Sequence, residues 1–217
     1  MKEIKLKYTY LFWDFNGTLF DDVEAGIKAV NKMLEERGLD VIPSTEKYRD
    51  IFDFPVIDYY RALGFDFDKE PYYEVLAPMW VELYNKYSLE STLCRGVGET
   101  LEAVRLAGVK QVLFSATEIN MLTCQLRSLS IEDSFDEVIG IDNIHAGGKL
   151  HLAKKWREEH PDARVLYVGD TVHDAENARV LGADCLLYVG GHQSRERLAK
   201  CGYPLIENIS DVMQYLK

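Results

Sequence analysis

The feature that most constrains the fold of this chain is a regular alternation of helices and short apolar strands after Arg95-Gly96. In four successive units, a predicted helix precedes a predicted strand of four or five residues. The helices are expected at about 99–107, 119–128, 149–160 and 175–181, and the strands at about 111–114, 137–141, 164–168 and 185–188. This order predicts an α/β fold with a doubly wound, Rossmann-like parallel sheet covered by helices on both faces.

A second region differs in character and is expected to be an inserted, all-helical domain. A buried apolar strand at about 8–13 comes first. Residues 39–93 then combine many Tyr and Phe with helix-opening prolines, and they contain no obvious strand. We therefore predict a core domain of residues 1–20 and 94–217 and a helical domain of residues 21–93.

The bulk properties exclude several classes of function. The chain has 217 residues and a net charge of −11, whereas a nucleic-acid surface needs a stripe of Lys and Arg. No apolar run is long enough to span a membrane, and the four cysteines form no CxxC pair, which favours free thiols in a reducing compartment. We expect a cytoplasmic protein, monomeric or homodimeric, that binds neither nucleic acid nor membrane.

The segment Tyr10–Asp22 carries the first chemical signal. Its apolar run stops at Asp14, and Asn16, Gly17 and Thr18 follow. Asp14 and Asn16 are two residues apart, so both can point to the same side of the strand end, and Gly17 allows a tight turn. A carboxylate, free backbone N–H groups and a small hydroxyl at the mouth of a sheet suit a nucleophile beside a bound anion.

Polar residues also follow the later strands, where a parallel sheet binds its ligands. Ser115 and Ala116 end an apolar strand, and Asp170 and Asp174 follow another. Lys149 closes the run HAGGK that opens a helix, so its amine and the free N–H groups of that turn can face an anion. Taken singly, Ser115 is typical of a turn or cap and Lys149 of a solvated helix residue.

Three carboxylates are expected to converge. Asp170 and Asp174 are four residues apart and can face one point if a helix begins between them, and Asp14 lies at the same edge. Singly, Asp174 is typical of a helix cap and Asp170 of a turn. Crowded carboxylates are costly unless a cation neutralises them, and oxygen ligands beside a phosphate favour Mg²⁺.

Together these segments resemble the haloacid dehalogenase superfamily across essentially the whole chain. The residues that match its four motifs are Asp14-Phe-Asn-Gly-Thr-Leu19, Ser115, Lys149, and Gly169-Asp170-Thr171 with Asp174. The helical insert resembles the family's type 1 cap. The tail Asp174–Ala183 is similar to the branch that contains phosphoglycolate phosphatases and β-phosphoglucomutases.

The resemblance implies a phosphoric monoester hydrolase that acts on a small phosphorylated metabolite through an aspartyl-phosphate on Asp14. The implied catalytic residues are Asp14, Asn16, Ser115 and Lys149. The implied phosphate-binding residues are Asp14, Gly17, Thr18, Ser115, Ala116 and Lys149. The implied ligands of Mg²⁺ are Asp14, the backbone carbonyl of Asn16, Asp170 and Asp174.

Asn16 departs from the family pattern, because related phosphatases usually carry a second aspartate there that protonates the leaving group. An amide keeps the backbone carbonyl for a metal but cannot exchange a proton at neutral pH, and acid–base help is worth roughly 10²–10⁴ in rate. Three interpretations follow: a slow phosphatase that favours good leaving groups or another acid, a phosphotransferase or mutase with a long-lived phosphoenzyme, or deamidation of Asn16-Gly17 to an aspartate. We rank the slow phosphatase first.

Other chemistries and a non-enzymatic role are also compatible with this pattern. Dehalogenation also lacks the second acid but needs no metal, whereas Gly169-Asp170 indicates one. Phosphonate cleavage needs a cap lysine, and Lys47, with Lys69 further on, has solvated surroundings. A catalytically impaired phosphate-binding regulatory protein is favoured only by Asn16.

The helical insert supplies candidates for contact with the organic part of a substrate. Arg49 and Arg61 could meet a carboxylate or a second phosphate, although solvated arginines are the more common case. The candidate tyrosines, most of which we expect to pack the insert's own core, are Tyr48, Tyr59, Tyr60, Tyr72, Tyr73, Tyr84 and Tyr87. His173, beside the acidic motif, is more typical of an exposed or supporting residue.

Overall fold

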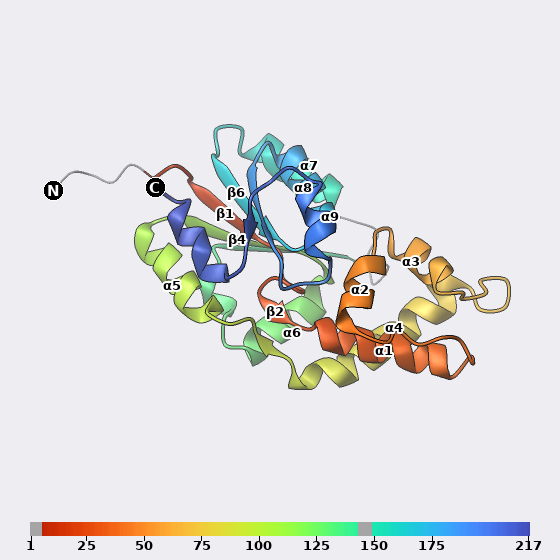
Figure 1. Ribbon diagram of the computed structural model, residues 1–217. Coiled ribbons are helices and arrows are strands. Elements are labelled where there is room, and N and C mark those ends of the chain that lie inside the picture. Colours follow the sequence, from red (N-terminus) through yellow and green to blue (C-terminus); the bar gives the residue numbers. More distant parts are fainter. Residues whose placement is uncertain (1–5, 143–148) are drawn as a thin grey trace.

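The computed structural model describes residues 6–142 and 149–217 and contains a six-stranded parallel sheet (Figure 1). The strand order is β5-β4-β1-β6-β7-β8, and every neighbouring pair is parallel. The strands are β1 (Tyr10–Trp13), β4 (Lys110–Glu118), β5 (Glu137–Ile141), β6 (Val165–Gly169), β7 (Asp184–Tyr188) and β8 (Leu205–Ile206). The α/β fold expected from the alternation is confirmed.

Helices cover both faces because side chains on a strand point alternately to opposite sides. Leu11 and Trp13 belong to the cluster on one face, and Phe12 belongs to the cluster on the other. The helices packed on the first face are α5 (Val97–Ala107), α6 (Ile119–Ser128) and η4 (Ile209–Gln214), a 3₁₀ helix. Those on the second face are α7 (Leu150–Glu159), α8 (Val172–Leu181) and α9 (Arg195–Ala199). A 3₁₀ turn, η3 (Glu132–Ser134), links α6 to β5.

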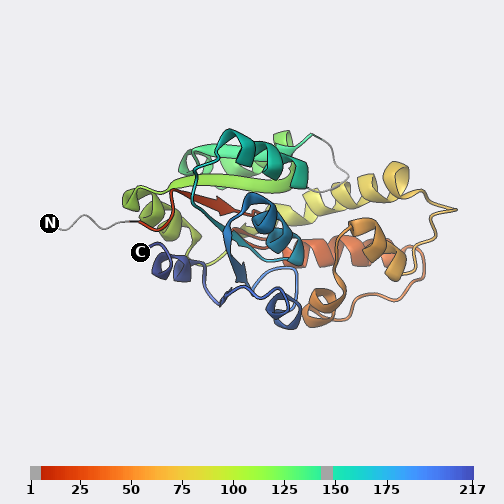
Figure 2. The same ribbon diagram turned by 90° about the horizontal axis from the view of Figure 1, so that it is seen from above.

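The segment between β1 and α5 forms a helical group at one end of the molecule, opposite the C-terminus (Figures 1 and 2). Its elements are α1 (Val23–Glu35), α2 (Thr45–Ile51), α3 (Val56–Ala62), the π-helical turn η1 (Tyr72–Leu76), α4 (Ala77–Tyr87) and the 3₁₀ turn η2 (Ser88–Glu90). Met33, Tyr60 and Leu76 are buried in a cluster of their own here. We call this group the cap; its domain boundaries at residues 21 and 93 stay a prediction.

Two short strands join the cap to the sheet. β2 (Phe20–Asp21) and β3 (Thr92–Leu93) pair antiparallel, so the chain enters and leaves the cap side by side. The sequence pattern indicated no strand in this region, because two residues are too few to show an alternation. The pairing places Asp22, the residue after β2, at the junction between the cap and the sheet.

Two element boundaries differ from the predicted ones in ways that affect the site. β4 runs on to Glu118 through an irregularity in its pairing with β5, so Ser115 lies within the strand. α8 begins at Val172 because the Thr171 side chain accepts a hydrogen bond from the Asp174 backbone N–H, and the Asp174 side chain accepts one from the Thr171 backbone.

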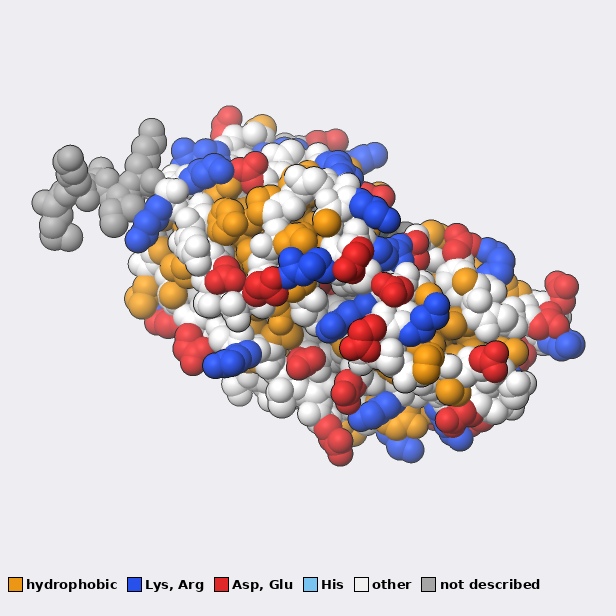
Figure 3. Space-filling model, viewed as in Figure 1, with side chains coloured by type: hydrophobic (Ala, Val, Ile, Leu, Met, Phe, Trp, Pro, Cys, Tyr) orange, Lys and Arg blue, Asp and Glu red, His pale blue; other side chains and the backbone are white. Residues whose placement is uncertain are grey.

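The surface agrees with the composition. On the face shown in Figure 3, acidic and basic side chains are interspersed over the sheet domain and the cap. Among the residues that the structure describes, no helix has both the length and the apolar character needed to cross a bilayer.

Candidate active site

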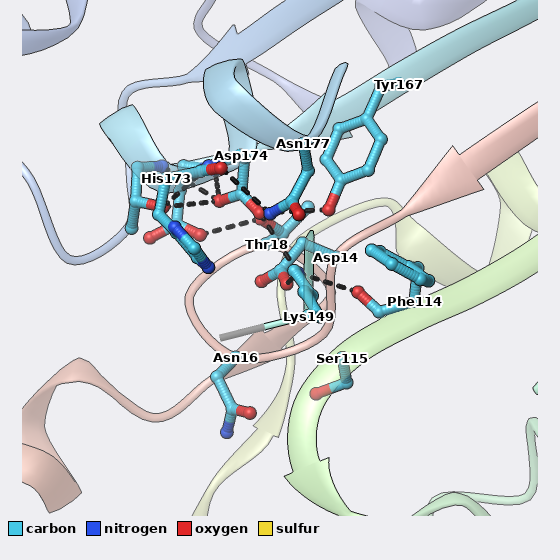
Figure 4. Close-up of polar contacts among 12 residues, drawn as sticks. Asp14, Asn16, Thr18, Phe114, Ser115, Lys149, Tyr167, His173, Asp174 and Asn177 are labelled. Carbon is cyan, nitrogen blue, oxygen red and sulfur yellow. Dashed lines mark hydrogen bonds and ion pairs between the residues drawn. The ribbon is translucent and has the colours of Figure 1, made fainter. Parts of the chain in front are cut away.

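The predicted site residues meet at the carboxyl edge of the three central strands. Asp14 follows β1, Ser115 lies near the end of β4, and Asp170 follows β6. Lys149 precedes α7 and reaches the same point, since its amine binds Asp14 (Figure 4). The other residues of the HAGGK run lie outside the described residues. Four segments that are far apart in sequence therefore line one cavity.

Asp14, Asp170 and Asp174 form a buried carboxylate cluster. One oxygen of each lies within 4.8 Å of the other two, and none of the three residues is more than 8% exposed. Lys149 is also buried and uses its amine on three oxygens: Asp14 Oδ1, Asp174 Oδ1 at 3.1 Å and the Phe114 carbonyl at 2.8 Å. One ammonium thus contacts two of the three carboxylates of the cluster.

Asp174 is held by groups on both sides of its carboxylate. Its Oδ2 accepts hydrogen bonds from the Thr171 hydroxyl at 2.6 Å and the Thr171 backbone N–H at 3.1 Å, and its Oδ1 accepts one from the Tyr167 hydroxyl at 3.0 Å. Although burial opposes it, Lys149 and Thr171 keep the pKa of Asp174 below its usual value. Asp174 can therefore serve both as a helix-capping residue and as a metal ligand, the two roles that the sequence suggested.

Asp170 is fully buried and is fixed by neighbouring loops. Its Oδ1 accepts a hydrogen bond from the Thr18 hydroxyl at 2.9 Å, and its Oδ2 accepts one from the His192 backbone N–H at 2.6 Å. Gly17 has φ of +72°, and a Cβ there would lie 2.4 Å from Asp170 Oδ2. The turn after β1 therefore requires glycine both for its backbone conformation and for space.

The electrostatics of the cluster favour a bound cation. Burial, together with Asp174, raises the pKa of Asp14 well above its usual value despite the attraction of Lys149. Burial also raises the pKa of Asp170 to about 6. For Lys149, burial works the other way, but Asp14 and Asp174 outweigh it and raise the pKa. The cluster is short of positive charge and consists of hard oxygen donors, which fits a divalent ion such as Mg²⁺.

Ser115 and Ala116 line the same cavity. The Ser115 hydroxyl donates to Thr117 Oγ1 at 3.1 Å and accepts from the Thr117 backbone N–H, also at 3.1 Å. Figure 4 shows Ser115 on β4 below the Asp14–Lys149 pair. This position is compatible with the phosphate-binding role that the sequence predicts, and that role stays a prediction.

Asn16 points away from the carboxylate cluster (Figure 4) and is bound on both ends of its amide. Its Nδ2 donates to Asp22 Oδ2 at 2.7 Å and to the Tyr84 hydroxyl at 2.8 Å, and its Oδ1 accepts from the Thr117 hydroxyl at 2.7 Å. All the polar atoms of this side chain are engaged with the junction between the cap and the sheet.

A second buried ionic group lies at that junction, and sequence reasoning missed it. Asp22 is 1% exposed; it accepts hydrogen bonds from the Tyr84 hydroxyl at 2.6 Å and the Gly17 backbone N–H at 2.8 Å. Its Oδ1 lies 3.3 Å from His192 Nε2, and His192 Nδ1 lies 2.8 Å from the Tyr48 hydroxyl. Against the effect of burial, Asp22 raises the pKa of His192 to about 9. The pair therefore stays charged at neutral pH.

The cavity extends from the carboxylate cluster into the cap. Its floor includes Asp14, Ser115 and Lys149, and its volume is about 170 Å³. Its cap wall is largely aromatic and includes Phe52, Phe54, Tyr59, Tyr60, Trp80 and Tyr84. Of the seven candidate tyrosines, Tyr48 and Tyr72 also line it, and these cap tyrosines are buried as predicted.

Comparison with known proteins agrees with this architecture. The chain is 29% identical over 191 residues to a phosphoglycolate phosphatase from Caulobacter vibrioides, covering 83% of this chain and 78% of that one. Its fold matches that of a haloacid dehalogenase-like family hydrolase from Streptococcus pneumoniae with a TM-score of 0.77 at 19% identity, over 96% and 98% of the two chains. It also matches the protein tyrosine kinase PtkA of Mycobacterium tuberculosis with a TM-score of 0.76 at 23% identity, over 95% and 97%.

The sequence pattern of one protein family covers residues 11–188, a span that begins within β1 and runs through the cap to the end of β7. That span contains Asp14, Ser115, Lys149, Asp170 and Asp174. The predictions of family membership and of a hydrolase are thereby confirmed. The chain belongs to the haloacid dehalogenase-like hydrolases.

Proposed function

We propose that this chain is a Mg²⁺-dependent phosphatase that hydrolyses a small phosphorylated metabolite through an aspartyl-phosphate on Asp14. The observation that carries the proposal is the buried cluster in which Lys149 binds Asp14 beside Asp170 and Asp174. The phosphatases among the relatives support the same reaction class. Phosphoryl transfer depends mainly on positioning and on neutralising charge, and this cluster supplies both.

The proposed first step forms a bond between Asp14 and phosphorus and breaks the bond between phosphorus and the ester oxygen. Lys149 holds Oδ1 of Asp14, which leaves the other carboxylate oxygen for in-line attack. Bound Mg²⁺, held by Asp14, Asp170, Asp174 and the backbone carbonyl of Asn16, would supply positive charge to the phosphoryl oxygens. Ser115 and Lys149 would donate hydrogen bonds to the same oxygens.

In the second step a water oxygen attacks the aspartyl-phosphate, inorganic phosphate leaves and the Asp14 carboxylate is restored. Asn16 cannot accept the proton of that water, and its amide is fully engaged with Asp22, Tyr84 and Thr117. We therefore expect slow hydrolysis of the phosphoenzyme. A long-lived phosphoenzyme is also what a phosphotransferase needs, so transfer of the phosphoryl group to an alcohol is a second candidate function.

The test is phosphate release from a panel of phosphorylated metabolites with and without Mg²⁺. The natural protein should turn over at least one substrate with Mg²⁺, and Asp14→Asn should abolish turnover. Asp133→Asn, an exposed aspartate in η3, is the matched control and should keep full activity. Mass spectrometry after acid quenching should find one phosphoryl group on Asp14.

Each alternative has its own result. Transfer of the phosphoryl group to an added alcohol in preference to water would identify a phosphotransferase. Phosphate binding with neither turnover nor a phosphoenzyme would identify a regulatory protein and refute the phosphatase. The cytoplasmic location and the monomeric or homodimeric state stay predictions.

A further inference from the structure

The cap side of the cavity is apolar and aromatic, which restricts the organic part of a substrate. Phe52, Phe54, Tyr60 and Trp80 line it above the carboxylate cluster. The whole cavity, from the carboxylate cluster to the cap wall, has a volume of about 170 Å³, whereas an apolar cavity of ~150 Å³ already binds benzene. Burying a ring of that size against aromatic walls strengthens binding by about 10–100-fold.

Among the described residues that line the cavity, each cation already has an acidic partner, so none is left for a second anionic group of a substrate. Lys149, the one lysine or arginine of the described lining, is bound to Asp14, and the charged His192 is paired with Asp22. The two candidate arginines are used elsewhere: Arg49 donates to the Gly190 and Gly191 carbonyls, and Arg61 pairs with Asp58 on the surface. A carboxylate, such as that of phosphoglycolate, would also lie near two acids of the lining, Asp22 and Glu118.

Two buried polar atoms of the lining have no hydrogen-bond partner among the described residues. They are the Tyr59 hydroxyl and Nε2 of His173, and Tyr59 is only 4% exposed. A buried hydroxyl without a partner is costly, so both atoms indicate a polar group on a ligand. The His173 ring also stacks on Phe54, with ring centres 5.0 Å apart, which keeps the aromatic wall continuous.

Asn16 also favours a substrate whose leaving group carries an aromatic ring. Without an acid to protonate the ester oxygen, the leaving group must depart as an anion. A phenol has a pKa of about 10, whereas an alkanol resembles water, whose pKa is about 15.7. A phenolate therefore needs far less help to leave than an alkoxide.

We propose that the substrate is a monoaryl phosphate with a polar substituent on its ring; this inference rests on the proposed phosphatase function. The phosphate binds at Asp14, and the ring lies in the cap cavity with its substituent at Tyr59. Asp14 forms the bond to phosphorus, and the phosphorus–oxygen bond breaks to release a phenolate, which takes its proton from water. Attack by a second water then restores Asp14.

Two pairs of substrates separate the contribution of ring binding in the cavity from that of the leaving group. Benzyl phosphate and 2-phosphoglycolate both leave as primary alkoxides, so their ratio reports the cavity. We expect kcat/KM to favour benzyl phosphate by about 10–100-fold, the value of burying one ring. Phenyl and benzyl phosphate both carry a ring, so their ratio reports the leaving group, and we expect phenyl phosphate to be faster by at least about 10²-fold.

Two variants of the cavity wall test which residues cause these substrate preferences. Trp80→Ala should lower kcat/KM at least about tenfold more for benzyl phosphate than for phosphoglycolate. Among the three hydroxyphenyl phosphates, the best should lose about fivefold more in kcat/KM with Tyr59→Phe than phenyl phosphate loses. Tyr203→Phe, outside the cavity lining, is the matched control and should change neither substrate.

The failures are distinguishable. A preference for phosphoglycolate over benzyl phosphate, or Tyr59→Phe acting equally on phenyl and hydroxyphenyl phosphates, would overturn the aryl substrate and leave the phosphatase intact. Absence of phosphate release and of a phosphoenzyme with every substrate would overturn the phosphatase and this inference together.

Discussion

Asn16→Asp would set a new carboxylate against the buried carboxylate of Asp22. The Asn16 amide nitrogen lies 2.7 Å from Asp22 Oδ2, and the substitution replaces that N–H donor with an oxygen. Two unit charges at 2.7 Å repel each other by about 6 kcal/mol at an effective dielectric of about 20, which corresponds to about 4.5 pKa units. We therefore expect the two carboxyl groups to share one proton at neutral pH.

The shared proton makes the variant a candidate general acid. Hydrolysis of alkyl phosphates such as benzyl phosphate should rise by about 10²–10⁴, while that of phenyl phosphate should change by about tenfold or less. The Tyr84 hydroxyl, now 2.8 Å from the amide nitrogen, can donate to either carboxyl group, so the fold should be retained.

The assay is phosphate release from benzyl and phenyl phosphate across a pH range, with intact mass confirming which residue stands at position 16. In the exchanged variant Asn16→Asp/Asp22→Asn, an amide again faces a carboxylate, so the new acid should ionise at lower pH. The alkaline limb of its pH–rate profile should therefore move to lower pH. An unchanged rate for benzyl phosphate in Asn16→Asp, with the folded state confirmed, would refute the claim that a missing acid limits the reaction.

Three further predictions concern charge. Asp14→Asn should abolish turnover yet leave the metal-free protein at least as stable in thermal unfolding, because it removes one of three crowded buried charges. Burial raises the pKa of Asp170 to about 6, so protonated Asp170 stabilises the folded protein below the usual pKa of an aspartate, and this stabilisation is lost as pH rises through 6. Mg²⁺ binds the ionised carboxylate, so the rise in Tm on adding Mg²⁺ should be larger at pH 7.5 than at pH 5. Asp22 raises the pKa of His192 from 6.5 to about 9, so the ion pair stabilises the folded protein fully below pH 6.5 and less as pH rises through 9. Urea unfolding should show that the free energy of unfolding falls by about 3 kcal/mol over that interval, and His192→Gln should remove this pH dependence.

The sheet could be predicted because its strands are buried on both faces. Strands such as β6 and β7 then appear as short apolar runs, each next to a helix, and the alternation leaves few other arrangements. The paired strands β2 and β3 could not be predicted, since their two residues each are joined by contact between segments about seventy positions apart. The cap's helices were expected, but their packing into a cavity wall depends on tertiary contacts.

The carboxylate cluster could be predicted for a related reason. Asp14 and Asp170 directly follow recognisable strands, Ser115 lies near the end of another, and parallel strands end at a common edge. Asp22 and His192 carry no such local signal. Asp22 precedes a helix, where an aspartate is common, and His192 follows two glycines in a loop. Only the fold brings Nε2 of this histidine within 3.3 Å of Asp22.

Asn16 has a different significance in the sequence and in the structure. In the sequence it is a missing acid. In the structure its amide donates to Asp22 and Tyr84 and accepts from Thr117, so the residue joins the cap helix α4 to the edge of the sheet. Because Asp22 is buried and charged, position 16 needs a donor there, and an aspartate would supply one only while protonated. The charge of Asp22 thus explains why an amide suits this site, and the loss of the acid explains why a substrate that leaves without a proton would suit it too.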